Sequence, residues 1–210
     1  MIKISIENRI ALITLDRPQK RNAITSDMAA RLRAAVAEAS DARVIVLAAS
    51  GTAFCAGADL AELDGCGDFS QLLEALSPQY LGTLPMPLIA AIQGPAVGLG
   101  LIIALQADLR FASANASFEA PFAKRGLPAE YDTARRLTEL IGTSHATEML
   151  LTARTVTAAE ALAMGLVNRV TGPDDLLSTT MEQARAMALL SPISLTAIKR
   201  QLAAIRQVLH

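Results

Sequence analysis

The sequence predicts an α/β fold in which strands alternate with helices, followed by a helical C-terminal region. Two continuous apolar runs, Val44–Ala49 and Leu88–Ile92, are typical of strands in a sheet that is buried on both faces. The segment Leu99–Gln106 is apolar on every side, which predicts a buried helix. Beyond residue 129 the pattern is mostly helical, with one short extended piece at 168–170.

Length and composition are those of one folded domain. The chain has 210 residues, of which 52% are hydrophobic and 19% charged, which argues against disorder. A net charge of −1 favours neither nucleic acid nor a membrane surface as a partner. The longest apolar run, 96–105, is too short to span a bilayer, and the start of the chain is not a signal peptide. Cys55 and Cys66 form neither a disulfide framework nor a metal site, so we expect a cytoplasmic protein without a metal.

The remaining elements follow from local patterns. A hairpin is expected at Ile2–Glu7 and 10–16, and a further strand at 108–112. Helices are expected from Ser26 to Ala39, at 59–67, 71–81, 129–141, 144–151, 158–164 and 174–190, and at Pro192–Val208.

The last helix has a narrow apolar stripe. Its members are spaced 3, 4, 3 and 4 residues apart, at Leu195, Ile198, Leu202, Ile205 and Leu209. This stripe fits either packing on the chain's own core or contact with another subunit. We therefore divide the chain into a core at 1–190 and a C-terminal helix at 191–210.

Two turns with small residues point to a function. Residues 54–60, Phe-Cys-Ala-Gly-Ala-Asp-Leu, follow the strand Val44–Ala49, and residues 94–100, Gly-Pro-Ala-Val-Gly-Leu-Gly, follow the strand Leu88–Ile92. One backbone N–H from each turn would be enough to hold an enolate or a tetrahedral oxyanion. The small side chains let a substrate approach the backbone closely. The glycines at 94, 98 and 100 do not have the spacing of a dinucleotide-binding motif.

Four segments in the same order resemble the crotonase superfamily, also called the enoyl-CoA hydratase/isomerase family. They are the opening strand and loop at 13–18 and 21–23, the turn at 54–60, the turn at 93–100 with its continuation to 109, and the segment 157–168. The resemblance covers nearly the whole chain. It implies a crotonase-like ββα spiral, an acyl-CoA thioester substrate, and trimers that often pair into hexamers. Coenzyme A would enter as part of the substrate, with no separate cofactor.

The resemblance also implies a site. The N–H groups of Ala58 and Leu99 would hold the thioester carbonyl, and Leu99 would start the buried helix, whose dipole adds positive potential. The coenzyme A adenine would lie against the backbone near Phe54, Cys55 and Ala56. Asp59, Leu60 and Gly98, which belong to the same turns, would also lie next to the substrate. Three basic residues either contact the coenzyme A phosphates or belong to a solvated loop: Arg17, Lys20 and Arg21.

The sequence departs from the hydratases of this family at two positions. Their two catalytic glutamates would fall at Ile102 and Phe122, and neither side chain can transfer a proton. Glu130 remains, four residues after Gly126, at a spacing where the isomerases of the family often place their single glutamate. It either moves the proton or is an ordinary acid in the first turn of a helix. Tyr131 either orients this carboxylate or lines the pocket.

Other polar residues have ordinary structural interpretations. We expect Asp59 to cap the helix that follows it, Asp132 to pair with Arg135 or Arg136, and Cys55 to be a buried, inert thiol.

Three functions remain open. The favoured one is an isomerase that shifts a double bond in an enoyl-CoA, with Glu130 as acid and base. The second is a hydratase with an altered acid/base set. The third is a non-catalytic acyl-CoA-binding protein that keeps the pocket and lacks the hydratase glutamates.

Overall fold

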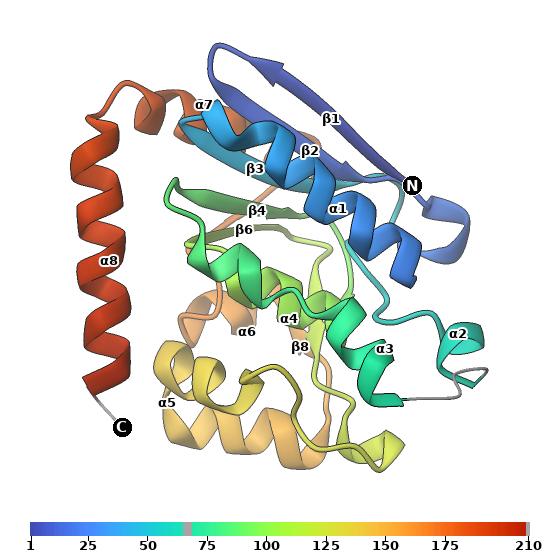
Figure 1. Cartoon of the computed structure of the whole chain (residues 1–210). Helices are drawn as coiled ribbons and strands as arrows, with labels where there is room; N and C mark the ends of the chain where they lie inside the picture. Colours follow the sequence, from blue (N-terminus) through green and yellow to red (C-terminus); the bar gives the residue numbers. More distant parts are fainter. Residues whose placement is uncertain (65–68, 209–210) are drawn as a thin grey trace.

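A computed structural model describes residues 1–64 and 69–208 (Figure 1). The predictions for Cys66, for Leu209 and for the end of the segment 59–67 lie outside the described residues. No described helix is long and apolar enough to cross a membrane.

The fold is built on a six-stranded sheet with the order β1-β2-β3-β4-β6-β9. Its strands are β1 (Ile2–Glu7), β2 (Ile10–Leu15), β3 (Val44–Ala49), β4 (Leu88–Ile92), β6 (Leu109–Ser113) and β9 (Arg169–Thr171). β1 and β2 form the expected antiparallel hairpin, and every other neighbouring pair is parallel. Because β3 and β4 are parallel neighbours, the turns that follow them leave the same edge of the sheet.

Helices cover both faces of this sheet (Figure 1). On β3, Ile45 and Leu47 point into the main core, which includes α1 (Ser26–Glu38) and α4 (Leu99–Gln106). The alternate residue Val46 packs on the other face with residues of α7. This explains why the sequence of β3 is apolar without interruption.

A second, three-stranded sheet was not predicted. It consists of β5 (Ala96–Val97), β7 (Ser117–Glu119) and β8 (Val156–Thr157). Strands of two or three residues leave no periodic signal in a sequence. This sheet carries the second turn, because β5 lies directly before Gly98 and Leu99.

Two predicted helices differ from the structure. The segment 71–81 is divided into α3 (Phe69–Leu76) and a 3₁₀ turn (Gln79–Thr83), because Pro78 between them has no N–H to donate. The predicted start at residue 129 is wrong, because α5 (Thr133–Thr152) begins four residues later.

The late start of α5 has a backbone cause. Tyr131 and Asp132 have positive φ values of 50° and 65°, which no α-helix continues. The break expected between the helices at 129–141 and 144–151 is confirmed, because Gly142 inside α5 has a φ of 72° and a ψ of 162°, which are not helical. The remaining helices are α2 (Leu60–Asp64), α6 (Ala158–Ala163), α7 (Leu176–Ala188) and α8 (Pro192–Val208).

Helix α8 runs along one side of the molecule (Figure 1). Lys199 Nζ contacts Asp108 Oδ2 at 2.6 Å, and Thr196 Oγ1 donates to the Pro85 carbonyl at 3.0 Å. The apolar stripe does not pack on the chain's own core, since Leu202 and Ile205 are 50% and 56% exposed. The interpretation as a subunit interface stays a prediction.

Candidate active site

The first turn is held between two other segments. Ile24 donates to the Gly57 carbonyl at 2.8 Å and accepts the Asp59 N–H at 2.8 Å. These bonds flank Ala58, whose own N–H therefore faces away from Ile24. Among the described residues, nothing accepts the Ala58 N–H.

The second turn ends at the start of α4. Gly98 has a φ of 53°, a conformation that favours glycine, and its N–H donates to the Glu119 carbonyl at 3.0 Å. Leu99 is the first residue of α4, and within the described chain its N–H has no acceptor. An N–H at a helix N-terminus carries the positive end of the helix dipole.

The two turns are in direct contact. Val97 donates its N–H to the Cys55 carbonyl at 3.0 Å. A Cβ placed on Gly57 would lie 3.1 Å from the Val97 carbonyl oxygen and 3.8 Å from the Leu99 nitrogen. With its φ of 106°, Gly57 also has a backbone that other residues rarely adopt.

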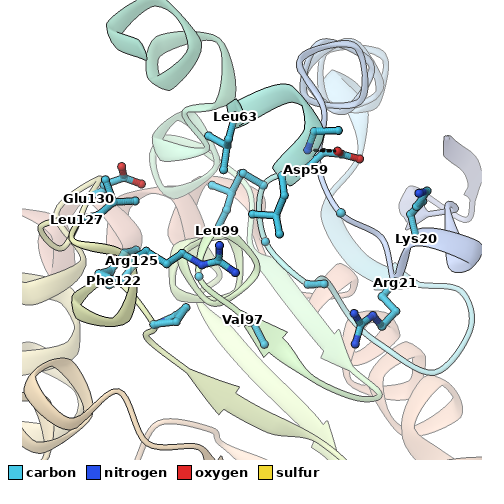
Figure 2. A pocket seen from close by; sticks show the side chains of 18 residues that line it. Lys20, Arg21, Asp59, Leu63, Val97, Leu99, Phe122, Arg125, Leu127 and Glu130 are labelled. Carbon is cyan, nitrogen blue, oxygen red and sulfur yellow. Dashed lines mark hydrogen bonds between the residues drawn. The ribbon is translucent and has the colours of Figure 1, made fainter. Parts of the chain in front are cut away.

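Both turns open onto one cavity of about 370 Å³ (Figure 2). The first turn contributes residues 56–60 and the second contributes residues 97–99. The loop before α5 supplies another wall, with the side chains of Phe122, Arg125, Leu127 and Glu130. Lys20 and Arg21 lie on the opposite side.

Among the described residues, no cation pairs with Glu130, one of the two acids that line the cavity. Burial raises the pKa of its carboxyl above the ordinary value. The residue lies in the loop before α5, not in its first turn, so the interpretation as a helix-start acid is wrong. Its carbonyl accepts the Thr133 N–H at 3.0 Å, which fixes the loop to the helix.

The second acid, Asp59, is already engaged. Its Oδ2 lies 2.5 Å from Arg17 Nη1, and this bond is the main reason that its pKa is lowered. Its Oδ1 accepts the Ala61 N–H at 3.1 Å and so caps α2, as expected. Arg17 also donates to the Ala23 carbonyl and does not line the cavity, unlike Lys20.

The other predicted site residues fall into two groups. Ala56, Leu60, Gly98 and Phe122 line the cavity. Four do not, and they are Phe54, Cys55, Ile102 and Tyr131.

The residues off the cavity have structural partners. Phe54, Cys55 and Ile102 are completely buried, and burial raises the pKa of the Cys55 thiol to about 12, so it is inert as expected. The hydroxyl of Tyr131 donates to the Leu73 carbonyl at 2.6 Å, which ties the loop to α3.

Charged residues around the site form ion pairs. Asp132 pairs with Arg135, as expected, and Glu119 pairs with Lys124 at 2.8 Å. Among the described residues, no three histidine, cysteine or acidic side chains gather where they could hold a metal.

Two residues of the cavity wall, Arg125 and Leu127, were not predicted from the sequence. Arg125 ends a 3₁₀ turn (Ala123–Arg125) that depends on Gly126 in the left-handed region. A basic residue before a glycine is too common to predict a pocket. Only the folded loop shows that this side chain faces Leu99 (Figure 2).

The fold and the site now define a class of protein. The family model described as enoyl-CoA hydratase/isomerase matches residues 5–208, so the chain belongs to the enoyl-CoA hydratase/isomerase family, the crotonase superfamily. The predicted crotonase-like fold is thereby confirmed.

Individual relatives agree with this assignment. The chain is 40% identical over 208 residues to a probable enoyl-CoA hydratase, echA6, of Mycobacterium leprae, covering 96% of this chain and 82% of that protein. A crystal structure of an enoyl-CoA hydratase subunit from Geobacillus kaustophilus has a TM-score of 0.92 at 36% identity, covering 98% of this chain and 82% of the other. A monofunctional enoyl-CoA isomerase from M. smegmatis has a TM-score of 0.85 at 33% identity, covering 98% and 93%.

Proposed function

We propose that this chain is an enoyl-CoA isomerase that shifts a double bond along the acyl chain of a coenzyme A thioester. One observation carries the proposal: the N–H groups of Ala58 and Leu99, which no described residue accepts, open onto the same cavity as Glu130. Two such donors are suited to an oxygen that becomes negative during the reaction.

In the proposed mechanism, the thioester carbonyl accepts the N–H groups of Ala58 and Leu99. The Glu130 carboxylate removes a proton from the α-carbon of a 3-enoyl-CoA. The electrons of that C–H bond delocalise over the carbonyl and the double bond, which gives a dienolate. Glu130 then returns the same proton to the γ-carbon, and the product is the 2-enoyl-CoA.

The raised pKa of Glu130 supports this role, because one group must act first as base and then as acid. A group whose pKa lies closer to the working pH can both accept a proton and give it back without a large free-energy cost in either direction. Among the side chains near it, Phe122 and Leu127 are apolar and supply the surroundings that produce the shift.

Ordinary two-glutamate hydration has less support. Ile102 is completely buried and does not line the cavity, and Phe122 carries no ionisable group. No second acid is therefore available at those two positions to activate water while the first delivers a proton.

For coenzyme A, we propose that Lys20 and Arg21 bind the phosphates. Both line the cavity on the side opposite to Glu130 (Figure 2). Arg17 is not included, since its guanidinium is bonded to Asp59.

The test is to incubate the pure protein with 2-enoyl-CoA and 3-enoyl-CoA, following absorbance and product mass. A shifted double bond without a change of mass supports the isomerase, whereas the gain of one water contradicts it and indicates a hydratase. Binding without any product also contradicts it and indicates a non-catalytic acyl-CoA-binding protein.

The role of Glu130 has its own variant. Glu130→Gln should lower turnover by about 10²- to 10⁴-fold and retain binding of the thioester. Glu119→Gln is the matched control, because Glu119 pairs with Lys124 and does not line the cavity. Unchanged turnover in Glu130→Gln would remove this residue from the mechanism.

A further inference from the structure

Arg125 places a positive charge in the cavity that the proposed reaction does not use. Figure 2 shows its guanidinium reaching across the cavity toward Leu99. Within the described chain, this guanidinium has no hydrogen-bond or ion-pair partner. The preceding residue, Lys124, points elsewhere and is neutralised by Glu119 at 2.8 Å.

The backbone holds Arg125 in this place. The Phe122 carbonyl accepts two N–H groups, from Arg125 at 2.9 Å and from Leu127 at 3.0 Å. The Phe122 side chain is 6% exposed and therefore anchors the loop in the core. Gly126, with a φ of 68°, closes the turn. The anchored turn thus fixes the Arg125 backbone at the wall of the cavity, and the residue itself is exposed.

The acids of the cavity do not neutralise this charge. Asp59 is bonded to Arg17. Among the described residues, no ion pair or hydrogen bond joins the Glu130 carboxylate to Arg125, although both line the cavity. An arginine that faces a binding cavity without a partner is suited to a carboxylate or phosphate of the ligand, which its planar fork can bind through two hydrogen bonds.

The position of Arg125 indicates which part of the ligand it would meet, the acyl chain or the phosphates. It shares its wall with Phe122, Leu127 and Glu130, whereas Lys20 and Arg21 lie across the cavity (Figure 2). If the reacting carbons lie beside Glu130, the group near Arg125 belongs to the acyl chain.

We propose that Arg125 is a specificity-determining residue that binds a carboxylate on the acyl chain, so that the preferred ligands are coenzyme A monothioesters of dicarboxylic acids. The inference rests on the proposed function for the placement of the thioester at Ala58 and Leu99. It adds the chemical class of the acyl group. A phosphate of coenzyme A is the other anion that could reach Arg125, and the experiment distinguishes the two.

The test measures dissociation constants by calorimetry for matched pairs of saturated thioesters, pentanoyl-CoA with glutaryl-CoA and hexanoyl-CoA with adipoyl-CoA, and for free coenzyme A. At least one dicarboxylic monothioester should bind about tenfold to a hundredfold more tightly than its neutral counterpart. Arg125→Gln should reduce that ratio to near one. Lys124→Gln, the matched control, removes the neighbouring cation and should leave the ratio unchanged.

Several results would overturn the inference. Equal binding of each pair by the native protein contradicts it, and so does a ratio that survives in Arg125→Gln. If Arg125→Gln weakens both members of a pair and free coenzyme A equally, Arg125 serves the phosphates instead. Failure of the isomerase proposal is seen separately, in the turnover of 3-enoyl-CoA by the native protein. A carboxylate preference without turnover would leave the present inference standing.

Discussion

Arg17 Nη1 lies 2.5 Å from Asp59 Oδ2, and this ion pair ties the loop after β2 to the residue that follows Ala58. The two side chains are 23% and 14% exposed, so solvent screens the pair only in part. Arg17 also donates to the Ala23 carbonyl at 3.0 Å, next to the Ile24 bridge that holds the first turn. From this arrangement we expect Arg17 to be a positioning residue for the Ala58 N–H.

Asp59→Asn tests this role. Asparagine keeps the cap of α2 and removes the charge, so we expect a loss of about 1 kcal/mol in the free energy of unfolding and a lower kcat with a smaller change in KM. The control is Asp16→Asn, which removes a more exposed ion pair between Asp16 and Lys3 and should cost less. Thermal unfolding and steady-state kinetics measure both effects. Equal kinetic effects in the two variants would contradict the positioning role.

The pH dependence of turnover follows from the raised pKa of Glu130. The carboxylate must be ionised to remove the first proton, so kcat/KM should fall as the pH drops through that pKa. Because the pKa is raised, this fall should begin at a higher pH than an exposed glutamate would give. A pH–rate profile with a plateau that extends down to the ordinary glutamate range would show that Glu130 is not the base.

Glu130 should also lower the stability of the folded protein as the pH rises. Its folded pKa is above its unfolded pKa, so the folded state binds more protons and stability is lost as the pH rises through the folded pKa. Glu130→Gln should therefore unfold at a slightly higher temperature than the native protein at neutral pH and at a similar temperature in acid. Partial exposure keeps the gain small, below about 1 kcal/mol or 2–4 °C. A gain that is larger in acid than at neutral pH would contradict the sign.

Much of the fold could be predicted because its strands are periodic or continuously apolar. β3 and β4 have the predicted bounds, and their parallel pairing explains why the two turns lie side by side. The start of α5 could not be predicted, since Tyr131 and Asp132 have positive φ values that residues other than glycine rarely adopt, and the Tyr131 hydroxyl donates to the distant Leu73 carbonyl.

The parts of the candidate site that consist of backbone N–H groups could be predicted from the sequence. The parts that consist of charged side chains were less predictable. The turns containing Ala58 and Leu99 have a signature of small residues, and both line the cavity. Arg17 and Lys20 look equivalent in the sequence, yet only Lys20 lines the cavity, because Arg17 is bonded to Asp59. Which member of a charged loop finds an internal partner depends on long-range contacts that local sequence does not contain.

Gly100 should not tolerate a side chain. A Cβ at this position would lie 2.2 Å from the Cys55 carbonyl oxygen, which belongs to the backbone of the first turn. Gly100→Ala should therefore separate the two turns, cost at least about 2–3 kcal/mol and abolish thioester binding. Gly172→Ala is the control, since the new Cβ would meet only the flexible carboxylate of Asp175 at 3.1 Å. Chemical denaturation compares the two, and a Gly100→Ala protein as stable as the control would show that the turns are not closely packed.

The exposed stripe of α8 should hold copies of this chain together. Ile198, Leu202 and Ile205 are 49%, 50% and 56% exposed at helical spacing, and burying the exposed half of each would contribute about 0.8–1.5 kcal/mol. We expect the native protein to form a trimer or hexamer and the double variant Leu202→Glu, Ile205→Glu to become monomeric, as measured by size-exclusion chromatography with light scattering. Arg200→Glu, on the other side of the helix, changes the charge without touching the stripe and should leave the mass unchanged. A monomeric native protein, or a double variant with the native mass, would show that α8 is not the interface.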